Sequence, residues 1–171
     1  MIHIFCYGSN LPKKRIFDRL GKVNYIGIAI LSKYQLVFNK KSKDNSAKAN
    51  IEFTNSDKDE VWGVVVQITE KQKIALDKFE KGYNEINIYA KLEGDNEIMA
   101  ITYVADKKAG EVSLKPFDWY KALVIFGALE HQFPSNYITN VKNIESMPDT
   151  NDERSNKNWD IIKESLITHF I

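Results

Sequence analysis

Two parts of the sequence carry groups that could do chemistry: a Tyr-Gly-Ser-Asn turn near the start and a glutamate at position 80. The turn consists of Tyr7, Gly8, Ser9 and Asn10 and follows a short apolar stretch. Gly8 permits backbone conformations that other residues resist, and Ser and Asn are common in turns and at helix N-caps. A strand, turn and helix in this order can direct several main-chain N–H groups at one carboxylate, phosphate or oxyanion. A tight turn without any ligand explains the same residues equally well.

Glu80 is the second candidate, because the pattern places it on the last turn of a helix predicted over residues 69–81. Its carboxylate would lie at the negative end of the helix dipole, which raises its pKa, and burial would raise the pKa further. A glutamate with a raised pKa can accept and return a proton near neutral pH. Taken by itself, however, the pattern is better explained by a solvated glutamate on a helix surface.

Other kinds of catalytic site find little support. The histidines His3, His131 and His169 are far apart, and none has a cysteine or carboxylate at metal-ligand spacing. A Walker-type loop and the glycine-rich dinucleotide fingerprint are both absent, so no nucleotide cofactor is indicated. Ser9 lacks the Gly-x-Ser-x-Gly motif of a serine nucleophile. Cys6 has no histidine at a spacing that would activate it, so a buried thiol in a strand is the simpler interpretation.

Length and charge restrict the class of protein and its partners. The chain has 171 residues, and 24 Lys and Arg against 23 Asp and Glu leave a net charge of +1. This balance gives no electrostatic reason to expect nucleic acid or an acidic membrane as a partner. No apolar run approaches the roughly 20 residues that cross a bilayer, and the start lacks the pattern of a signal peptide. Because a single cysteine excludes an intrachain disulfide, we expect a cytoplasmic protein. The length predicts one domain over residues 1–171, and the sequence is compatible with a monomer or a homodimer.

The order of strand and helix patterns predicts an α+β protein. Residues 60–68 give the strongest strand pattern, because dense β-branched residues are typical of a strand buried on both faces. Shorter strand patterns occur at residues 2–6, 23–30, 34–38, 49–53, 85–92 and 97–104. Strands that come mostly before the helices favour α+β over a doubly wound parallel sheet. The pattern alone does not distinguish a small barrel from an open sheet.

The sequence also predicts several connections and helices. Residues 34–38 are expected to form a hairpin with the strand at 23–30, in which Gly27 marks a bulge or bend. The polar residues 39–48 lack a period and are expected to form an exposed, mobile loop. Thr69 and Gln72 are spaced as a capping box for the second helix, and Gly82 is expected to stop it. Helix patterns occur at residues 13–20 and 69–81, from 116 onward, and at 134–144 and 158–170.

Four short motifs follow one another along the chain. They are Tyr-Gly-Ser-Asn-Leu at 7–11, Asp-Glu-Val-Trp-Gly-Val-Val at 59–65, Leu-Asp-x-x-Glu at 76–80, and a helical segment from Tyr120 to Ala128 followed by Pro-x-x-Tyr at 134–137. In this order they resemble the gamma-glutamylcyclotransferase family, also called the AIG2-like family. The resemblance extends from residue 4 to about residue 144.

The resemblance implies a fold, an activity and a set of site residues. The fold would be a small mixed β-barrel of about six or seven strands flanked by helices, with the helical part from about 116 to 171 packed on it. The family releases 5-oxoproline from gamma-glutamyl compounds without metal or cofactor, so the expected partner is a small-molecule gamma-glutamyl substrate. Glu80 would be the catalytic acid/base, and Tyr120 would contact the substrate. The turn at residues 7–10 would hold the gamma-glutamyl group, mostly through main-chain N–H groups.

One departure from the family pattern keeps other hypotheses open. The family usually has Gly directly after the catalytic Glu, whereas Lys81 stands there in this chain and Gly82 follows. Either the end of the helix is shifted by one residue, or the Lys81 side chain reaches the mouth of the site. A non-catalytic module that binds a gamma-glutamyl or other small ligand, and an interaction protein that uses residues 39–48, are the alternatives. Tyr83, Tyr103 and Tyr137 are expected in the core rather than in the pocket.

Overall fold

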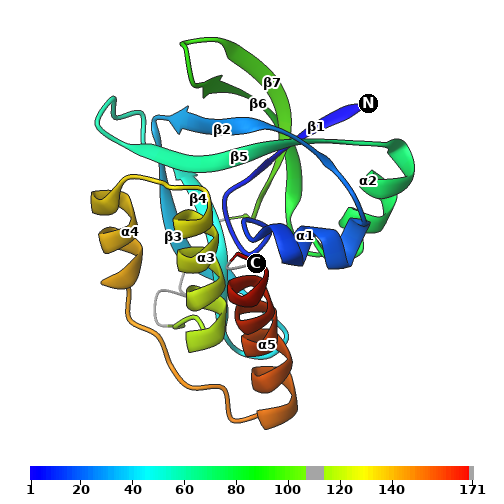
Figure 1. The fold of residues 1–171 in the computed structure, drawn as a ribbon. Coiled ribbons are helices and arrows are strands. Elements are labelled where there is room, and N and C mark those ends of the chain that lie inside the picture. The colour runs from blue at the N-terminus through cyan, green and yellow to red at the C-terminus, as the bar shows by residue number, and fades with distance from the viewer. Residues whose placement is uncertain (107–113, 170–171) are drawn as a thin grey trace.

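Five strands close into a barrel, two more strands form a separate sheet, and helices cover one end of the molecule (Figure 1). The computed structural model describes residues 1–106 and 114–169. The barrel contains β1 (Ile2–Cys6), β5 (Glu60–Ile68), β2 (Asn24–Ser32), β6 (Asn84–Leu92) and β7 (Glu97–Val104), in that spatial order. The second sheet pairs β3 (Tyr34–Lys41) with β4 (Ala47–Phe53). The α+β class is therefore confirmed, but the barrel has five strands among the described residues, fewer than the six or seven expected.

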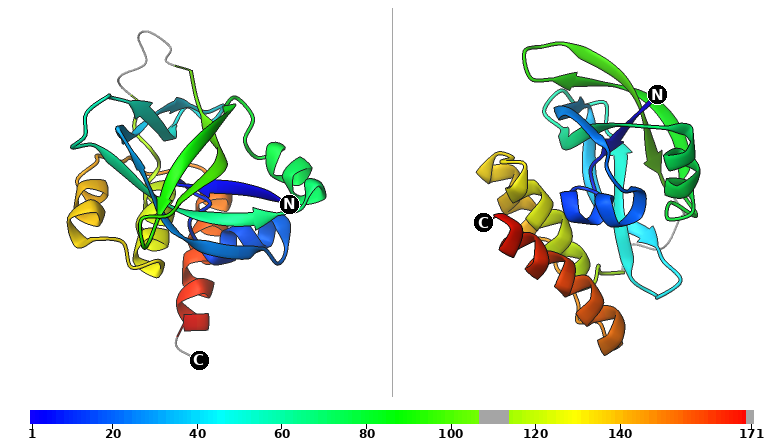
Figure 2. Two further views of the ribbon diagram at one scale, coloured as in Figure 1. Left: turned by 90° about the horizontal axis from the view of Figure 1, so that it is seen from above. Right: turned by 45° about the vertical axis from the view of Figure 1, so that its right-hand side comes forward.

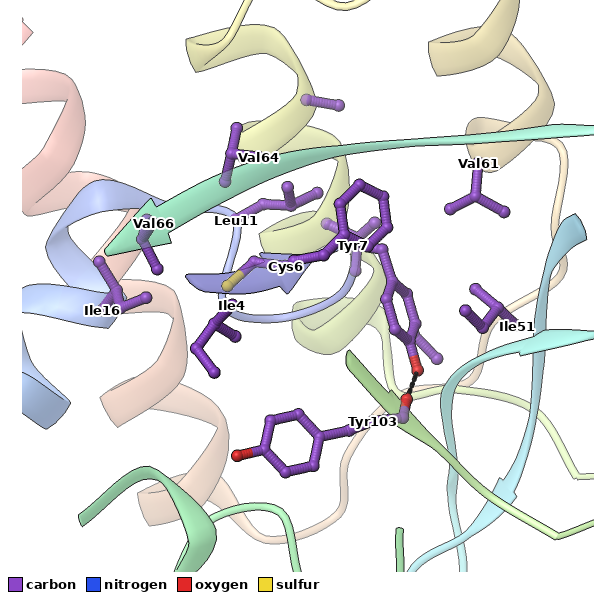
Figure 3. Packing of buried hydrophobic residues seen from close by; sticks show 14 of the residues in the cluster. Ile4, Cys6, Tyr7, Leu11, Ile16, Ile51, Val61, Val64, Val66 and Tyr103 are labelled. Atoms are coloured by element: carbon purple, nitrogen blue, oxygen red, sulfur yellow. Dashed lines mark hydrogen bonds between the residues drawn. The ribbon is translucent and has the colours of Figure 1, made fainter. Parts of the chain in front are cut away.

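β5 is the central strand of the barrel, as its β-branched pattern predicts. It pairs antiparallel with β1, where Cys6 lies opposite Val64, and with β2 on its other side. β1 also pairs parallel with β7 at Ile4, and this contact closes the barrel. Val61, Val64, Val65 and Val66 are all buried, and Figure 3 shows Val64 and Val66 near the β1 side chains Ile4 and Cys6 and Val61 near Ile51 of β4. The bulge expected near Gly27 occurs as a register shift between Tyr25 and Gly27.

The hairpin expected between β2 and residues 34–38 does not form. The chain turns at Lys33, which has a φ of 66°, and β3 then pairs with β4, where Leu36 lies opposite Ile51. β2 pairs instead with β5 and, at its end, with β6. The alternation of apolar residues specifies that a strand forms and which face is buried, but it does not specify which strand it pairs with.

Half of the polar segment 39–48 belongs to paired strands, and only the other half is a turn. Residues 39–41 complete β3, and Ala47 and Lys48 begin β4, so only a short turn remains between them. The Ser42 N–H donates to the Ser46 carbonyl across this turn, at 3.0 Å. The prediction was wrong because backbone pairing tolerates polar side chains on the solvent face of a two-stranded sheet.

The helices pack against one another in a connected series beside the barrel (Figures 1 and 2). α1 (Lys13–Leu20) contacts both α2 (Glu70–Asp77) and α5 (Asp152–His169), and α3 (Asp118–Glu130) packs on α4 (Ser135–Lys142) and on α5. α1 has the predicted bounds, the capping box of α2 is present, and α5 begins six residues earlier than expected. Among the described residues, no helix is both long and apolar enough to span a membrane. One hydrophobic cluster runs from the barrel into α3 and α4.

Candidate active site

The turn that follows β1 is held in place by its own hydrogen bond and by α3 behind it. The Leu11 N–H donates to the Gly8 carbonyl at 3.0 Å, and His131 Nε2 lies 2.9 Å from the Leu11 carbonyl oxygen. Gly127 of α3 packs so closely that a Cβ atom there would lie 2.3 Å from Leu11 Cβ. α3 therefore fixes the position of the turn, which explains why a glycine is required in the middle of that helix.

The main-chain N–H groups of this turn are free to bind a ligand. Within residues 1–106 and 114–169, those of Gly8, Ser9 and Asn10 donate to no protein acceptor. Asn10 is not the N-cap expected from the sequence, because the N-cap of α1 is Pro12 with an extended backbone. Unpaired N–H groups in a concave turn form a ready site for an anion or a developing oxyanion.

Glu80 lies beyond the end of α2 and not on its last turn. The helix ends at Asp77, and the Phe79 and Glu80 N–H groups donate to Leu76 and Asp77 carbonyls, three residues earlier, at 2.8 and 3.3 Å. These shorter-range bonds tighten the end of the helix, which a 3.6-residue pattern does not reveal. Gly82, with a φ of 82°, ends the turn that follows and not the helix itself. The helix dipole is therefore not what sets the pKa of Glu80.

The Glu80 carboxylate is buried among polar partners. Its side chain is 13% exposed, Asn10 Nδ2 donates to its Oε1 at 2.9 Å, and Arg19 Nη1 lies 3.7 Å from the same oxygen. Arg19 Nη1 also donates to Asn10 Oδ1. Burial raises the pKa of the Glu80 carboxyl above its ordinary value, against the opposing influence of Arg19, Asn10 and Lys40. Removal from water disfavours the charged form, so this carboxyl can exchange a proton nearer to neutral pH.

A single small cavity of about 30 Å³ brings the predicted site residues together. Its lining includes all six of them, namely Tyr7, Gly8, Ser9, Asn10, Glu80 and Tyr120. It also includes Tyr83 and Tyr103, which we expected in the core, whereas Tyr137 packs against Phe133 elsewhere. The sequence could not place these tyrosines, because an aromatic residue that lines a pocket and one that fills a core follow the same strand and helix periods.

Hydrogen bonds fix the tyrosines around this cavity. The Tyr7 hydroxyl donates to the Tyr103 carbonyl at 2.5 Å, as Figure 3 shows, and the Tyr83 hydroxyl donates to the Ala49 carbonyl at 2.7 Å. The Tyr120 hydroxyl accepts a hydrogen bond from the Ala49 N–H at 3.1 Å. Burial raises the pKa of all four hydroxyls. They are therefore protonated near neutral pH and cannot serve as bases. The hydroxyl protons of Tyr7 and Tyr83 are already donated to main-chain carbonyls, and that of Tyr103 is donated to Asp77 Oδ1 at 2.7 Å.

Two cations near Glu80 were missed by the sequence analysis. Arg19 comes from α1, three residues after the buried Ile16, and a charged residue on the apolar face of a helix was the available signal. Lys40 comes from β3, where its Nζ donates to the Lys81 carbonyl at 3.1 Å and lies 4.8 Å from the centre of the Tyr83 ring. No sequence signal could have found Lys40, because its position depends on the pairing of β3. The Lys81 side chain is exposed and is not part of the cavity lining.

The described residues of this site offer neither a reactive thiolate nor a cluster of metal ligands. Burial raises the pKa of Cys6 to about 12, so the thiolate needed for nucleophilic attack is scarcely populated at neutral pH. Among the described residues, no three His, Cys, Asp or Glu side chains come together as metal ligands. The chemistry available to the cavity is therefore that of one carboxylate, several hydroxyls and free main-chain N–H groups.

Comparison with known proteins identifies the family. The model of the AIG2-like family matches residues 60–141. The gamma-glutamylcyclotransferase of Bos taurus is 29% identical over 148 residues, which cover 82% of this chain and 77% of that protein. The same protein of Mus musculus is 30% identical over 148 residues, again with 82% and 77% covered. The chain belongs to the gamma-glutamylcyclotransferase family.

The solved structures agree with this family assignment. One solved gamma-glutamyl cyclotransferase matches with a TM-score of 0.80 at 29% identity, covering 95% of this chain and 98% of the other. The family and its barrel fold, which the sequence motifs predicted by resemblance, are therefore confirmed. The likeness extends over both the barrel and the helices, since nearly the whole of each chain is covered.

Proposed function

We propose that this protein is a cofactor-free cyclotransferase that releases 5-oxoproline from a gamma-glutamyl amide or amine. Its support is the arrangement of one cavity, in which the Glu80 carboxylate and the free N–H groups of the turn at residues 7–10 meet, within a chain of this family. In the reaction, the α-amine of the substrate attacks its own γ-carbonyl carbon. A five-membered ring closes, the bond to the leaving amine breaks, and no second substrate is required.

Holding the substrate in a folded conformation would supply much of the rate. Intramolecular attack in a well-aligned geometry reaches effective molarities of roughly 10⁵–10⁸ M. Three tyrosine hydroxyls are tied by hydrogen bonds to main-chain groups, and α3 fixes the turn, so these parts of the lining keep their positions while other side chains shift to admit the substrate. A lining that is fixed at these points favours the compact conformation of the glutamyl group over its extended ones.

Glu80 would carry both proton transfers. The α-amine arrives as an ammonium and must lose a proton before it attacks, and the leaving amine must gain one. A carboxylate that takes the first proton and returns the second meets both needs, an effect worth on the order of 10²–10⁴-fold. The raised pKa of the Glu80 carboxyl suits this exchange, because it brings the acid and base forms closer in free energy near neutral pH.

The turn would stabilise the oxygen of the tetrahedral intermediate. The N–H groups of Gly8, Ser9 and Asn10 have no protein acceptor within the described part of the chain. Donors already aimed at a developing oxyanion need no reorganisation when the charge forms. Arg19 and Lys40 near the single carboxylate Glu80 add positive charge, which suits a gamma-glutamyl group because that group carries its own carboxylate. Tyr120 would donate a hydrogen bond to the bound substrate.

The test is direct assay of 5-oxoproline release. Purified protein is incubated with a panel of gamma-glutamyl amino acids and amines, and 5-oxoproline is quantified by chromatography. Glu80→Gln keeps the shape of the side chain but not the base, so kcat should fall by about 10²–10⁴-fold. The matched control is Glu93→Gln, an exposed carboxylate away from the cavity, which should retain full activity. Activity that survives Glu80→Gln contradicts the mechanism.

A non-catalytic binding module of the same fold is the alternative, and it is motivated by Lys81, which stands where the family usually has Gly after the catalytic Glu. The cavity of about 30 Å³ holds one or two water molecules, so in either case a glutamyl group enters only when lining side chains shift. A gamma-glutamyl ligand that raises the melting temperature, with no 5-oxoproline released from any compound of the panel, would select this alternative. Rapid release of 5-oxoproline would remove it.

A further inference from the structure

We propose that Arg19 is a positioning residue that, together with Asn10, holds one carboxylate oxygen of Glu80 and leaves the other oxygen for proton transfer with the substrate. This inference rests on the proposed function, in which Glu80 is the general acid/base. It concerns a residue of α1 that forms no part of the cavity lining and contacts Asn10 and Glu80, which do.

The three side chains form a closed triangle. Arg19 Nη1 donates to Asn10 Oδ1, Asn10 Nδ2 donates to Glu80 Oε1 at 2.9 Å, and Arg19 Nη1 lies 3.7 Å from that same Oε1. The two ends of an asparagine amide differ, because the oxygen only accepts and the nitrogen only donates. A cation on Oδ1 therefore turns Nδ2 toward Glu80. Both contacts reach Oε1, and no hydrogen bond among the described residues reaches Oε2.

Arg19 is itself held in one orientation. Its side chain is 14% exposed, and its guanidinium lies 4.6 Å from the centre of the Phe79 ring. Phe79 directly precedes Glu80, so one turn of the chain supplies both the ring that Arg19 covers and the carboxylate that it approaches. A cation over an aromatic ring is attracted by the ring's negative face, and the attraction grows as water is removed. Arg19 therefore couples the end of α1 to the turn that carries the base.

Arg19 also affects the charge state of Glu80. Burial raises the pKa of the Glu80 carboxyl, and Arg19 opposes it more than any other neighbour does, ahead of Asn10, Lys40 and Arg15. The ionisable groups that face Glu80 are Arg19 and Arg15 from α1, Lys40 from β3, and the neutral Cys6, Tyr7, Tyr83, Tyr103 and Tyr120. Loss of Arg19 would thus leave the buried carboxylate with only the more distant cations to stabilise its ionised form.

The geometry requires an arginine and not merely a positive charge. A guanidinium is planar and presents donors in fixed directions, whereas a lysine ammonium is a point charge on a flexible stem. Arg19→Lys would keep the charge near Glu80 but lose the fixed contact to Asn10. The two contributions, charge and orientation, can therefore be separated by comparing Arg19→Gln with Arg19→Lys.

The experiment measures the pKa of Glu80 directly and the pH dependence of the reaction. The side-chain carboxyl carbons of Glu are labelled with ¹³C, the Glu80 signal is assigned from its absence in Glu80→Gln, and each variant is titrated without substrate. In parallel, kcat/KM for 5-oxoproline release is followed against pH, since it reports the ionisation of the free enzyme's base. Melting temperatures establish that each variant is folded.

Arg19→Gln should raise the Glu80 pKa and move the acid limb of kcat/KM to higher pH by roughly one pH unit. Arg19→Lys should move that limb by less, yet lower kcat by about tenfold with KM little changed, because orientation is lost while charge remains. Lys40→Gln is the matched control: it removes a cation near Glu80 without touching the triangle, and should shift the limb less than Arg19→Gln does. Asn10→Ala breaks the same link without altering α1 and should also raise the Glu80 pKa.

The two proposals fail in different ways. A protein that releases no 5-oxoproline from any compound contradicts the proposed function, while the carboxyl titration still tests the role of Arg19. An unchanged Glu80 pKa in folded Arg19→Gln and Asn10→Ala overturns the inference, whatever the activity. Full kcat in Arg19→Lys overturns the positioning role and leaves only the charge.

Discussion

The two turns that meet at the cavity are held by different forces. The turn at residues 7–11 is held by packing, because Leu11 is fully buried and Gly127 of α3 lies directly against it. The turn that carries Glu80 is held by polar contacts to Asn10, Arg19 and Lys40, and its carboxylate loses solvation by being there. The first turn therefore adds to the stability of the fold, whereas ionisation of Glu80 in the second subtracts from it. In the proposed mechanism, the first turn binds the substrate and the second transfers protons.

The largest effect should come from the packed turn. In Gly127→Ala, the new Cβ would lie 2.3 Å from Leu11 Cβ and 2.9 Å from the Leu11 carbonyl carbon, so α3 or the turn must move. We expect a loss of about 2 kcal/mol of unfolding free energy, measured by urea denaturation, together with reduced activity. Gly27→Ala is the control, since a Cβ there makes only ordinary contact with Leu92 at 3.6 Å. Equal stability of the two variants would contradict the packing explanation.

A smaller loss of stability should follow when the hydrogen bond between the Tyr7 hydroxyl and β7 is removed. Tyr7→Phe removes the hydroxyl that donates to the buried Tyr103 carbonyl at 2.5 Å and leaves that carbonyl without this partner. Stability should fall by about 1 kcal/mol in thermal or urea unfolding, because a buried hydrogen bond contributes about that much. An unchanged midpoint would mean that water replaces the lost hydroxyl.

Substitution of Glu80 in the polar turn should raise the stability of the fold, whereas the two substitutions above lower it. The size of this increase should depend on pH. The pKa of Glu80 is higher in the folded than in the unfolded protein. Its contribution to the free energy of unfolding is therefore fully present below the unfolded pKa, where the carboxyl is protonated, and is lost as the pH rises through the folded pKa. Glu80→Gln is neutral at every pH and should melt a few degrees higher than the wild type at pH 8, but not at pH 4. Melting curves of both proteins across this range test the prediction, and a constant difference would refute it.

The smallest effect should come from Lys81, although the sequence drew attention to it. Its side chain is exposed, and its main-chain carbonyl accepts a hydrogen bond from Lys40 Nζ at 3.1 Å. Lys81→Ala should change stability by less than about 0.5 kcal/mol and leave kcat/KM close to the wild-type value. A large loss of activity would show that the lysine does reach the bound substrate.

The sequence predicted what depends on local pattern and missed what depends on pairing between distant segments. The strand at 60–68, helix α1 and the Thr69–Gln72 capping box follow from nearby residues and were confirmed. The partner of β3 was wrong, because a strand pattern carries no information on which strand lies beside it. Glu80 as a candidate base came from the family motifs, since the residues alone favoured a surface glutamate. Arg19 and Lys40 depend on how α1 and β3 pack, which no short motif records.

Ala49 of β4 connects the two-stranded sheet to the wall of the pocket. Its N–H donates to the Tyr120 hydroxyl and its carbonyl accepts from Tyr83, so both main-chain groups of one β4 residue are engaged by the pocket wall. A tilt of β3 and β4 relative to the barrel would move the Tyr83 and Tyr120 rings, because both hydroxyls are hydrogen-bonded to Ala49, and would widen or narrow the pocket. Lengthening the turn at residues 42–46, which joins β3 to β4, is therefore expected to change the size of the pocket even though these residues do not line it.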